Sequence, residues 1–248
     1  MALQRIHDLL AELTQGAAHF PPTELYNEGW MLRLMLDWFA NHTVSDHPLS
    51  FQANATWYSE ALLPSAFLPR RHGDTLGESR THADGVIGHF VIGQQGKADF
   101  DLLPGATQFL VLEAKMNSKL SSGTSNAPYF DQAVRNVACI AEVLLRANRP
   151  ADQLTDLAFY VLAPQAAIDN GKFTNELHHD SIMKKVVRRV GDYQGEKDDW
   201  HANWFLPLLE HVTIETLSWE SLLACIDKHD PNSAAEYRDF YANCLHFN

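Results

Sequence analysis

Phe109–Lys115 reads FLVLEAK, and this stretch decides how the chain folds. Its first four residues form a continuous apolar run, which is typical of a strand buried on both faces of a sheet. We therefore expect this strand to be central. Residues two apart in a strand project from the same face, so Glu113 and Lys115 leave the sheet side by side. Two charges at the end of a buried strand need partners or a chemical role.

Two helices are predicted before this strand. Apolar residues recur at helical spacing over Leu3–Leu13 and over about Glu24–Asn41, where Thr23 can cap the second helix. Prolines and glycines then punctuate Pro48–Arg80, which predicts a long loop with at most short elements. Strand-like residues over His82–Ile92, with a turn at Gln95-Gly96, predict a hairpin.

Helices and one more strand are predicted after FLVLEAK. The helices cover about Pro128–Ala147, with Pro128 in the first turn, and Ser181–Val190. The strand covers Leu157–Leu162 and ends at Pro164. Two further helical patterns follow Leu217 and divide near Asp230-Pro231.

This order predicts an α/β fold with a mixed central sheet flanked by helices. We find no internal repeat and no linker-like composition that would mark a domain boundary. The chain is therefore expected to form a single domain over residues 1–248. Its core would occupy 24–164, followed by a mainly helical extension over 165–248.

The composition is that of a chain able to bury a substantial core. Of its 248 residues, 46% are hydrophobic and 20% are charged, which excludes a disordered tail and a disulfide-stapled miniprotein. The formal net charge of -12 means that a nucleic-acid partner would have to meet a local patch. Three widely spaced cysteines favour a reducing compartment. With no signal-like start and no apolar run of membrane-spanning length, we expect a cytoplasmic protein without membrane partners.

A second acid, Asp84, lies near the start of the predicted hairpin. If the hairpin and FLVLEAK are neighbours in the sheet, the carboxylates of Asp84 and Glu113 converge. Two close anions favour a hard divalent cation such as magnesium. The alternative is structural: Asp84 would start a turn with Gly85, and Glu113 would form a plain ion pair with Lys115.

Glu28 is a further candidate because of its place on the predicted helix Glu24–Asn41. At about 100° per residue, the helix surrounds Glu28 with large apolar side chains and groups its polar residues opposite. A buried carboxylate is costly unless it is paired or coordinated, so Glu28 is expected to reach a cation, directly or through water. The alternative, an acid stabilised by the helix dipole, is weakened because Glu28 falls past the first turn of the predicted helix.

The order of these residues resembles the PD-(D/E)xK nuclease superfamily, which has the restriction-endonuclease-like fold. The resemblance covers about Tyr26–Pro164. The matching residues are the leading-helix acid, the motif aspartate and the acid-x-Lys pair, namely Glu28, Asp84, Glu113 and Lys115. Ala83 departs from the pattern, since it stands where the motif has its proline. The resemblance implies a core of order αβββαβ, with extra N- and C-terminal helices here.

These side chains can support metal-dependent hydrolysis of phosphodiesters, with DNA favoured over RNA. Asp84 and Glu113, assisted by Glu28, would hold magnesium or manganese, which would polarise the phosphodiester and lower the pKa of a water. Lys115 would position that water or neutralise the developing charge. Gln132, where many members of the superfamily carry a polar residue facing the site, would orient either group.

Other polar clusters are weaker candidates. The arginines that precede the Asp84 segment are best placed to touch a substrate, namely Arg70, Arg71 and Arg80. The basic helix Ser181–Val190 could grip phosphates, but a solvated basic face is the commoner outcome. Asp99 and Asp101 rival Asp84 but have loop-like flanks. His178 and His179 are adjacent and would point about 100° apart on a helix, which favours a surface or capping role over a metal cluster.

Two functions are consistent with the sequence. The first is a metal-dependent nuclease, which could act as a homodimer and for which the acidic charge favours an end, a branched structure or a single strand. The second is a nuclease-fold interaction module that binds a protein partner without catalysis, supported by the acidity and by Trp200, Trp204 and Trp219. The costly charges in an apolar setting favour the enzyme.

Overall fold

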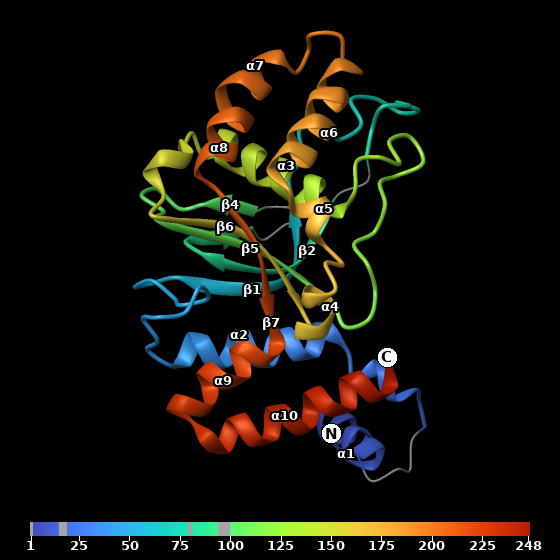
Figure 1. Ribbon diagram of the computed structural model, residues 1–248, viewed down its shortest axis with the longest axis vertical. Coiled ribbons are helices and arrows are strands. Elements are labelled where there is room, and N and C mark those ends of the chain that lie inside the picture. The colour runs from blue at the N-terminus through green and yellow to red at the C-terminus, as the bar shows by residue number, and fades with distance from the viewer. Residues whose placement is uncertain (1, 15–18, 79–80, 94–99) are drawn as a thin grey trace.

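The computed structural model describes residues 2–14, 19–78, 81–93 and 100–248. At its centre is a five-stranded sheet with the order β1 (Thr56–Leu63), β2 (Thr81–Gly88), β5 (Gln108–Ala114), β6 (Asp156–Ala163) and β7 (Thr213–Ser218) (Figure 1). β2 is antiparallel to both β1 and β5, whereas β5, β6 and β7 run parallel. The expected α/β fold with a mixed sheet is therefore confirmed.

Helices cover both faces of this sheet (Figure 1). One face packs against α3 (Gln132–Arg146), α6 (His179–Gly191) and α8 (Leu206–His211). The other packs against α2 (Glu28–Asn41), α9 (Trp219–His229) and α10 (Pro231–Phe247). β5 contributes Phe109 and Val111 to the first core and Leu110 and Leu112 to the second. This two-sided burial explains its continuous apolar run, and β5 is the central strand, as predicted.

Helix α1 (Ala2–Thr14) comes first in the chain, and short elements connect the remaining ones. They are η1 (Pro22–Glu24), β3 (Phe90–Ile92), β4 (Phe100–Leu102), η2 (Ala151–Gln153), α4 (Gln165–Asp169), α5 (Thr174–Leu177), α7 (Asp198–Trp200) and the π-helical turn η3 (His201–Phe205). β3 and β4 pair with each other in a separate two-stranded sheet. Among the described helices, none combines the length and the apolar character needed to cross a bilayer.

The predicted loop Pro48–Arg80 contains a strand that the sequence did not reveal. β1 lies at the edge of the sheet, and only its last three residues are fully buried. Its outer half therefore lacks the regular alternation by which strands are recognised. Glu60 also has a φ of 58°, which interrupts a regular strand conformation. Pairing with β2 along most of its length, rather than local preference, makes this segment a strand.

Two helices begin later than predicted, because capping side chains stand closer to the helical pattern. Asn27 caps α2 by accepting a hydrogen bond from Trp30 N at 3.0 Å, so Thr23 is not the cap. Asp131 caps α3 by accepting from Val134 N at 3.2 Å, so Pro128 lies before the helix rather than in its first turn.

The predicted hairpin is divided between two sheets. β2 pairs with β1 and β5, whereas β3 pairs with β4. Gly88 ends β2 with a φ of 149°, and a Cβ there would clash with the Gln108 carbonyl oxygen. Only glycine allows this close approach. The predicted turn at Gln95-Gly96 lies outside the described residues.

The segment 165–248 is mainly helical but also contributes β7, which completes the sheet beside β6. The sheet therefore extends past the predicted core boundary at residue 164. β7 is half-buried and short, so its six residues carry only a weak strand pattern.

Candidate active site

Asp84 and Glu113 lie opposite each other on neighbouring strands. Gly85 of β2 pairs with Leu112 of β5 in an antiparallel register, so the next residues along are Asp84 and Glu113. One carboxylate oxygen of Asp84 accepts a hydrogen bond from Ala114 N at 2.7 Å. The convergence expected from the sequence is thus present. Asp84 lies inside β2 and not in a turn, so the alternative role for Asp84 is wrong.

Lys115 and Glu113 form the ion pair that the structural alternative gave them, and the pair lies directly beside Asp84. Lys115 Nζ lies 2.5 Å from Glu113 Oε1, and the two side chains are 11% and 0% exposed. The backbone holds Lys115 on both sides, because its N–H donates to Leu162 O at 2.8 Å and its carbonyl accepts from Trp219 Nε1 at 3.0 Å. These bonds hold the backbone of Lys115 at the end of β5, and the pairing with Glu113 holds its ammonium group.

Two amide side chains of α3 complete the surroundings of Glu113. Gln132 Nε2 donates to Glu113 Oε1 at 2.5 Å, as the sequence suggested for this residue. Asn136 Nδ2 lies 3.3 Å from Glu113 Oε2, and Asn136 is fully buried. Asn136 was missed in the sequence. The sequence feature that could have identified Asn136 is its position four residues after Gln132, which places both amides on one face of the helix.

The electrostatics of the site are those of a crowded acid pair. Burial, followed by the charge of Asp84, raises the pKa of Glu113 well above its ordinary value. For Lys115 burial acts in the opposite direction, but the nearby carboxylates of Glu113, Asp84 and Glu28 outweigh it and raise the pKa of the ammonium. The site therefore keeps its lysine charged and resists a second negative charge.

Glu28 does not occupy the helix position expected from the sequence. It is the first residue of α2 and is half-buried, so it stands in the first turn, where the helix dipole favours an acid. The prediction that it falls past the first turn was wrong because the helix begins at Glu28 itself. Its charge nevertheless contributes, after those of Glu113 and Asp84, to the raised pKa of Lys115.

The donor set fits a divalent cation through two carboxylates. Within residues 2–14, 19–78, 81–93 and 100–248, no group of three or more His, Cys, Asp or Glu side chains is arranged to hold a metal ion. Glu28 therefore does not complete a three-carboxylate set with Asp84 and Glu113. Magnesium is commonly bound by one or two carboxylates together with waters and substrate phosphates. The paired oxygens of Asp84 and Glu113 meet that requirement.

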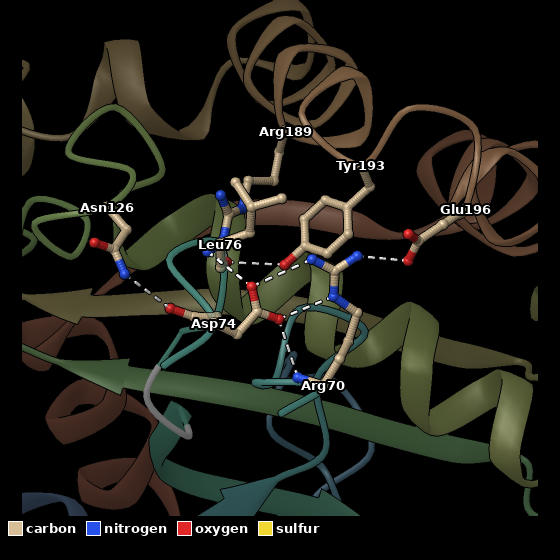
Figure 2. Close-up of polar contacts among 8 residues, drawn as sticks. Arg70, Asp74, Leu76, Asn126, Arg189, Tyr193 and Glu196 are labelled. Carbon is tan, nitrogen blue, oxygen red and sulfur yellow. Dashed lines mark hydrogen bonds and ion pairs between the residues drawn. The ribbon is translucent and has the colours of Figure 1, made fainter. Parts of the chain in front are cut away.

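The predicted substrate arginines lie elsewhere or are already engaged. Figure 2 shows Arg70 between two carboxylates, with its Nε 2.9 Å from Asp74 Oδ2 and its Nη1 2.6 Å from Glu196 Oε2. Its guanidinium also lies over the ring of Tyr193, 4.9 Å from the centroid. Arg71 is exposed, and Arg80 lies outside the described residues. The structure does not bring Arg70 together with the acid pair, and a substrate role for these arginines stays a prediction.

The structure also shows the surroundings of most of the polar residues that the sequence suggested as weaker candidates. Arg189 of the basic helix is fully buried rather than solvated, and Lys185 pairs with Asp131 at 2.6 Å. His178 caps α6 by accepting from Asp180 N at 3.2 Å, so its capping role is confirmed. Asp101 lies on β4, in the separate two-stranded sheet, and Asp99 lies outside the described residues.

No protein-family model, no curated protein and no solved structure matches this chain. A proposal for its function therefore depends on the chemistry of the site.

Proposed function

We propose that the protein is a nuclease that hydrolyses phosphodiester bonds with a bound magnesium or manganese ion and prefers DNA to RNA. One observation carries the proposal: Asp84, within β2, meets Glu113 and Lys115 at the end of the neighbouring strand β5. A structural ion pair has no need of the additional carboxylate, whose charge makes the buried Glu113 still harder to ionise. A divalent cation would remove that conflict.

The order of elements gives the proposal a second support. α2, β1, β2, β5, α3 and β6 follow one another as a helix, three strands, a helix and a strand, with β3 and β4 inserted before β5. This order agrees with the core that the resemblance to PD-(D/E)xK nucleases implies. The first helix begins with Glu28, and the second strand contains Asp84. The third strand contains Glu113 and is followed directly by Lys115.

The side chains would divide the work as follows. Asp84 and Glu113 would supply the anionic oxygens that hold the cation. When bound, the cation would polarise the phosphodiester and lower the pKa of a water. Lys115 would neutralise negative charge developing on the phosphate, since its ammonium is held beside the acid pair. Gln132 and Asn136 would orient the Glu113 carboxylate through their amide groups.

The direct test incubates the purified protein with duplex, single-stranded and branched DNA and with RNA, while magnesium or manganese is titrated. We expect cleavage that a chelator removes and added metal restores. Lys115→Ala should abolish this cleavage and still unfold cooperatively. Lys184→Ala, which changes an exposed lysine on α6, is the matched control and should cleave as the wild type does. Retained turnover in Lys115→Ala would exclude the assignment.

A second candidate, a nuclease-fold module that binds a protein partner, is favoured by one specific observation. Glu113 already receives hydrogen bonds from Lys115, Gln132 and Asn136, so its oxygens have partners without a cation. Absence of cleavage on every substrate, together with an unfolding temperature that magnesium does not change, would favour this module over the nuclease.

A further inference from the structure

A cavity of about 420 Å³ lies between α6 and α8, which belong to the group of helices at the top of Figure 1. Its apolar floor consists of Met183 of α6 and of Leu206 and Leu209 of α8. Val187 follows Met183 by one helical turn, is 50% exposed, and extends the apolar surface along α6. We call this surface the α6–α8 groove. None of its residues belongs to the candidate active site.

The rest of the cavity lining is polar and includes two acids but neither a lysine nor an arginine. It consists of His179 and Asp180 at the start of α6 and Glu210 near the end of α8. In the part of the chain that the structure describes, the carboxylates of Asp180 and Glu210 form no ion pair and accept no hydrogen bond. The helix dipole favours an acid at the position of Asp180 but disfavours one at the position of Glu210. Local structure therefore does not account for Glu210.

The basic residues of α6 leave the groove acidic because most of them have partners elsewhere. Lys185 and Arg189 pair with carboxylates, and Arg188 lies over an aromatic ring, with its Cζ 3.7 Å from the centroid. Lys184 is exposed and does not line the cavity. Even with Lys184 counted, one cation stands against two acids.

We propose that the α6–α8 groove binds an amphipathic helix of a protein partner, with apolar side chains on the floor and lysines or arginines beside Asp180 and Glu210. Apolar grooves of this kind take the apolar face of an amphipathic helix. A cationic partner would be attracted by the two acids and by the formal net charge of -12, whereas a nucleic acid would be repelled. The proposal goes beyond the nuclease function and does not depend on it.

The test measures binding of a synthetic probe to the full chain. A labelled helical peptide of about 15 residues, with leucines at helical spacing and lysines on both sides of them, is titrated by fluorescence anisotropy. We expect it to bind at least about tenfold more tightly than two matched peptides, one with alanine for leucine and one with glutamate for lysine. Glu210→Lys should weaken binding of the basic peptide at least about fivefold. Glu236→Lys makes the same charge change at an exposed position of α10 and should weaken it less than about twofold.

A second variant tests the apolar floor from the side of the protein. Met183→Ala, with its folding checked by urea denaturation, should weaken binding of the basic peptide at least about threefold. Equal losses in Glu210→Lys and Glu236→Lys would mean that net charge alone attracts the peptide, and this would overturn the proposal. Equal affinity of the three peptides, or no binding of the basic one, would overturn it as well.

The remaining outcomes separate this inference from its alternatives. Self-association of the protein that Glu210→Lys removes, measured by sedimentation, would assign the groove to a second copy of the chain and overturn the proposal. The nuclease function is tested by cleavage, which none of these measurements uses. The two proposals can therefore fail independently.

Discussion

Two buried carboxylate–cation pairs belong to the half of the molecule that carries α3 and α6, and they differ in their neighbours. Glu113 and Lys115 meet at the end of β5, where the acid Asp84 adjoins them. Glu78 and Arg189 are 2% and 0% exposed, with Arg189 Nε 3.0 Å from Glu78 Oε1. In the first pair the additional carboxylate lies beside the acid, whereas in the second pair the additional carboxylate, that of Asp192, lies 3.7 Å from the cation, which aromatic rings surround.

The surroundings of Arg189 are those of a finished structural contact. Its guanidinium lies 5.4 Å from the ring centroid of Phe67 and 5.3 Å from that of Tyr193. Arg189 and the Tyr193 hydroxyl both donate to the carbonyl of Leu76, so α6 is fastened to the segment before β2 (Figure 2). Cations thus surround the acid Glu78, whose pKa burial raises to about 7 against the lowering effect of Arg189 and Arg135.

The different surroundings of Glu113 and Glu78 distinguish a candidate functional site from a structural ion pair. Burial raises the pKa of both carboxyls, so a perturbed pKa alone does not mark function. What distinguishes Glu113 is that its nearest additional charge is an anion, which adds to the cost of burial. Under the proposed function, a bound divalent cation would offset the charges of both Asp84 and Glu113, whereas Glu78 is next to two arginines and no second acid adds to its cost of burial.

The largest expected effect concerns catalysis. Glu113→Gln should reduce metal-dependent cleavage at least about 10³-fold, equivalent to about 4 kcal/mol of transition-state stabilisation. The free energy of unfolding should stay equal or rise, because the substitution removes a buried charge that Asp84 opposes. Single-turnover kinetics and urea denaturation measure the two quantities. A Glu113→Gln variant with wild-type cleavage and a lower free energy of unfolding would show that Glu113 has a structural role, as Glu78 does.

Arg189→Leu should have the opposite profile. Removing one partner of the buried pair leaves Glu78 without its cation, and we expect a loss of about 3 kcal/mol in the free energy of unfolding. Cleavage per folded molecule should not change. The double variant Glu78→Leu/Arg189→Leu should recover part of the lost stability, since apolar replacements of both partners are often tolerated. Loss of cleavage in folded Arg189→Leu would show that the Glu78–Arg189 pair affects the Glu113 site, and the two pairs would then not have separate roles.

The third prediction concerns pH. Because the pKa of Glu78 is raised from 4.5 to about 7 in the folded protein, the folded state holds a proton in this interval that the unfolded state has lost. The stabilisation is full below the lower value and is lost as the pH rises through the upper one. Between about pH 5 and about pH 8, the unfolding free energy of the wild type should fall by about 2 kcal/mol relative to Glu78→Gln. Urea denaturation of both proteins at both pH values measures this, and identical pH profiles would contradict it.

The smallest effect sharpens the description of the Glu113 site. Asn136→Ala should lower the rate of cleavage about tenfold, or about 1.4 kcal/mol, because the Glu113 carboxylate loses one of its orienting donors. The magnesium concentration for half-maximal rate should also rise, which a loss of packing alone would not produce. Cys139→Ala removes a buried side-chain atom one turn further along α3 and serves as the control. If Asn136→Ala and Cys139→Ala changed the magnesium requirement to a similar extent, Asn136 would have no specific role in orienting Glu113.

Short-range patterns in the sequence were enough to predict much of the fold and the centre of the site. The apolar run before Glu113 predicted a central strand, and the two-residue spacing predicted that Glu113 and Lys115 would lie together, because strand geometry determines both locally. The helices over Leu3–Leu13 and Ser181–Val190 were predicted from their 3.6-residue period. Each of these apolar patterns repeats over several helical turns, which is enough to predict a helix from the sequence alone.

Tertiary structure alone decided which distant groups meet. β1 and β7 are strands because they pair with β2 and β6, although their own residues show little alternation. Asn136 approaches Glu113 because α3 packs on that face of the sheet, and Arg189 leaves the expected solvated face because aromatic rings and Glu78 surround it. A helical or strand period is set by neighbours along the chain. The partner of a side chain is set by packing between segments that the sequence keeps far apart.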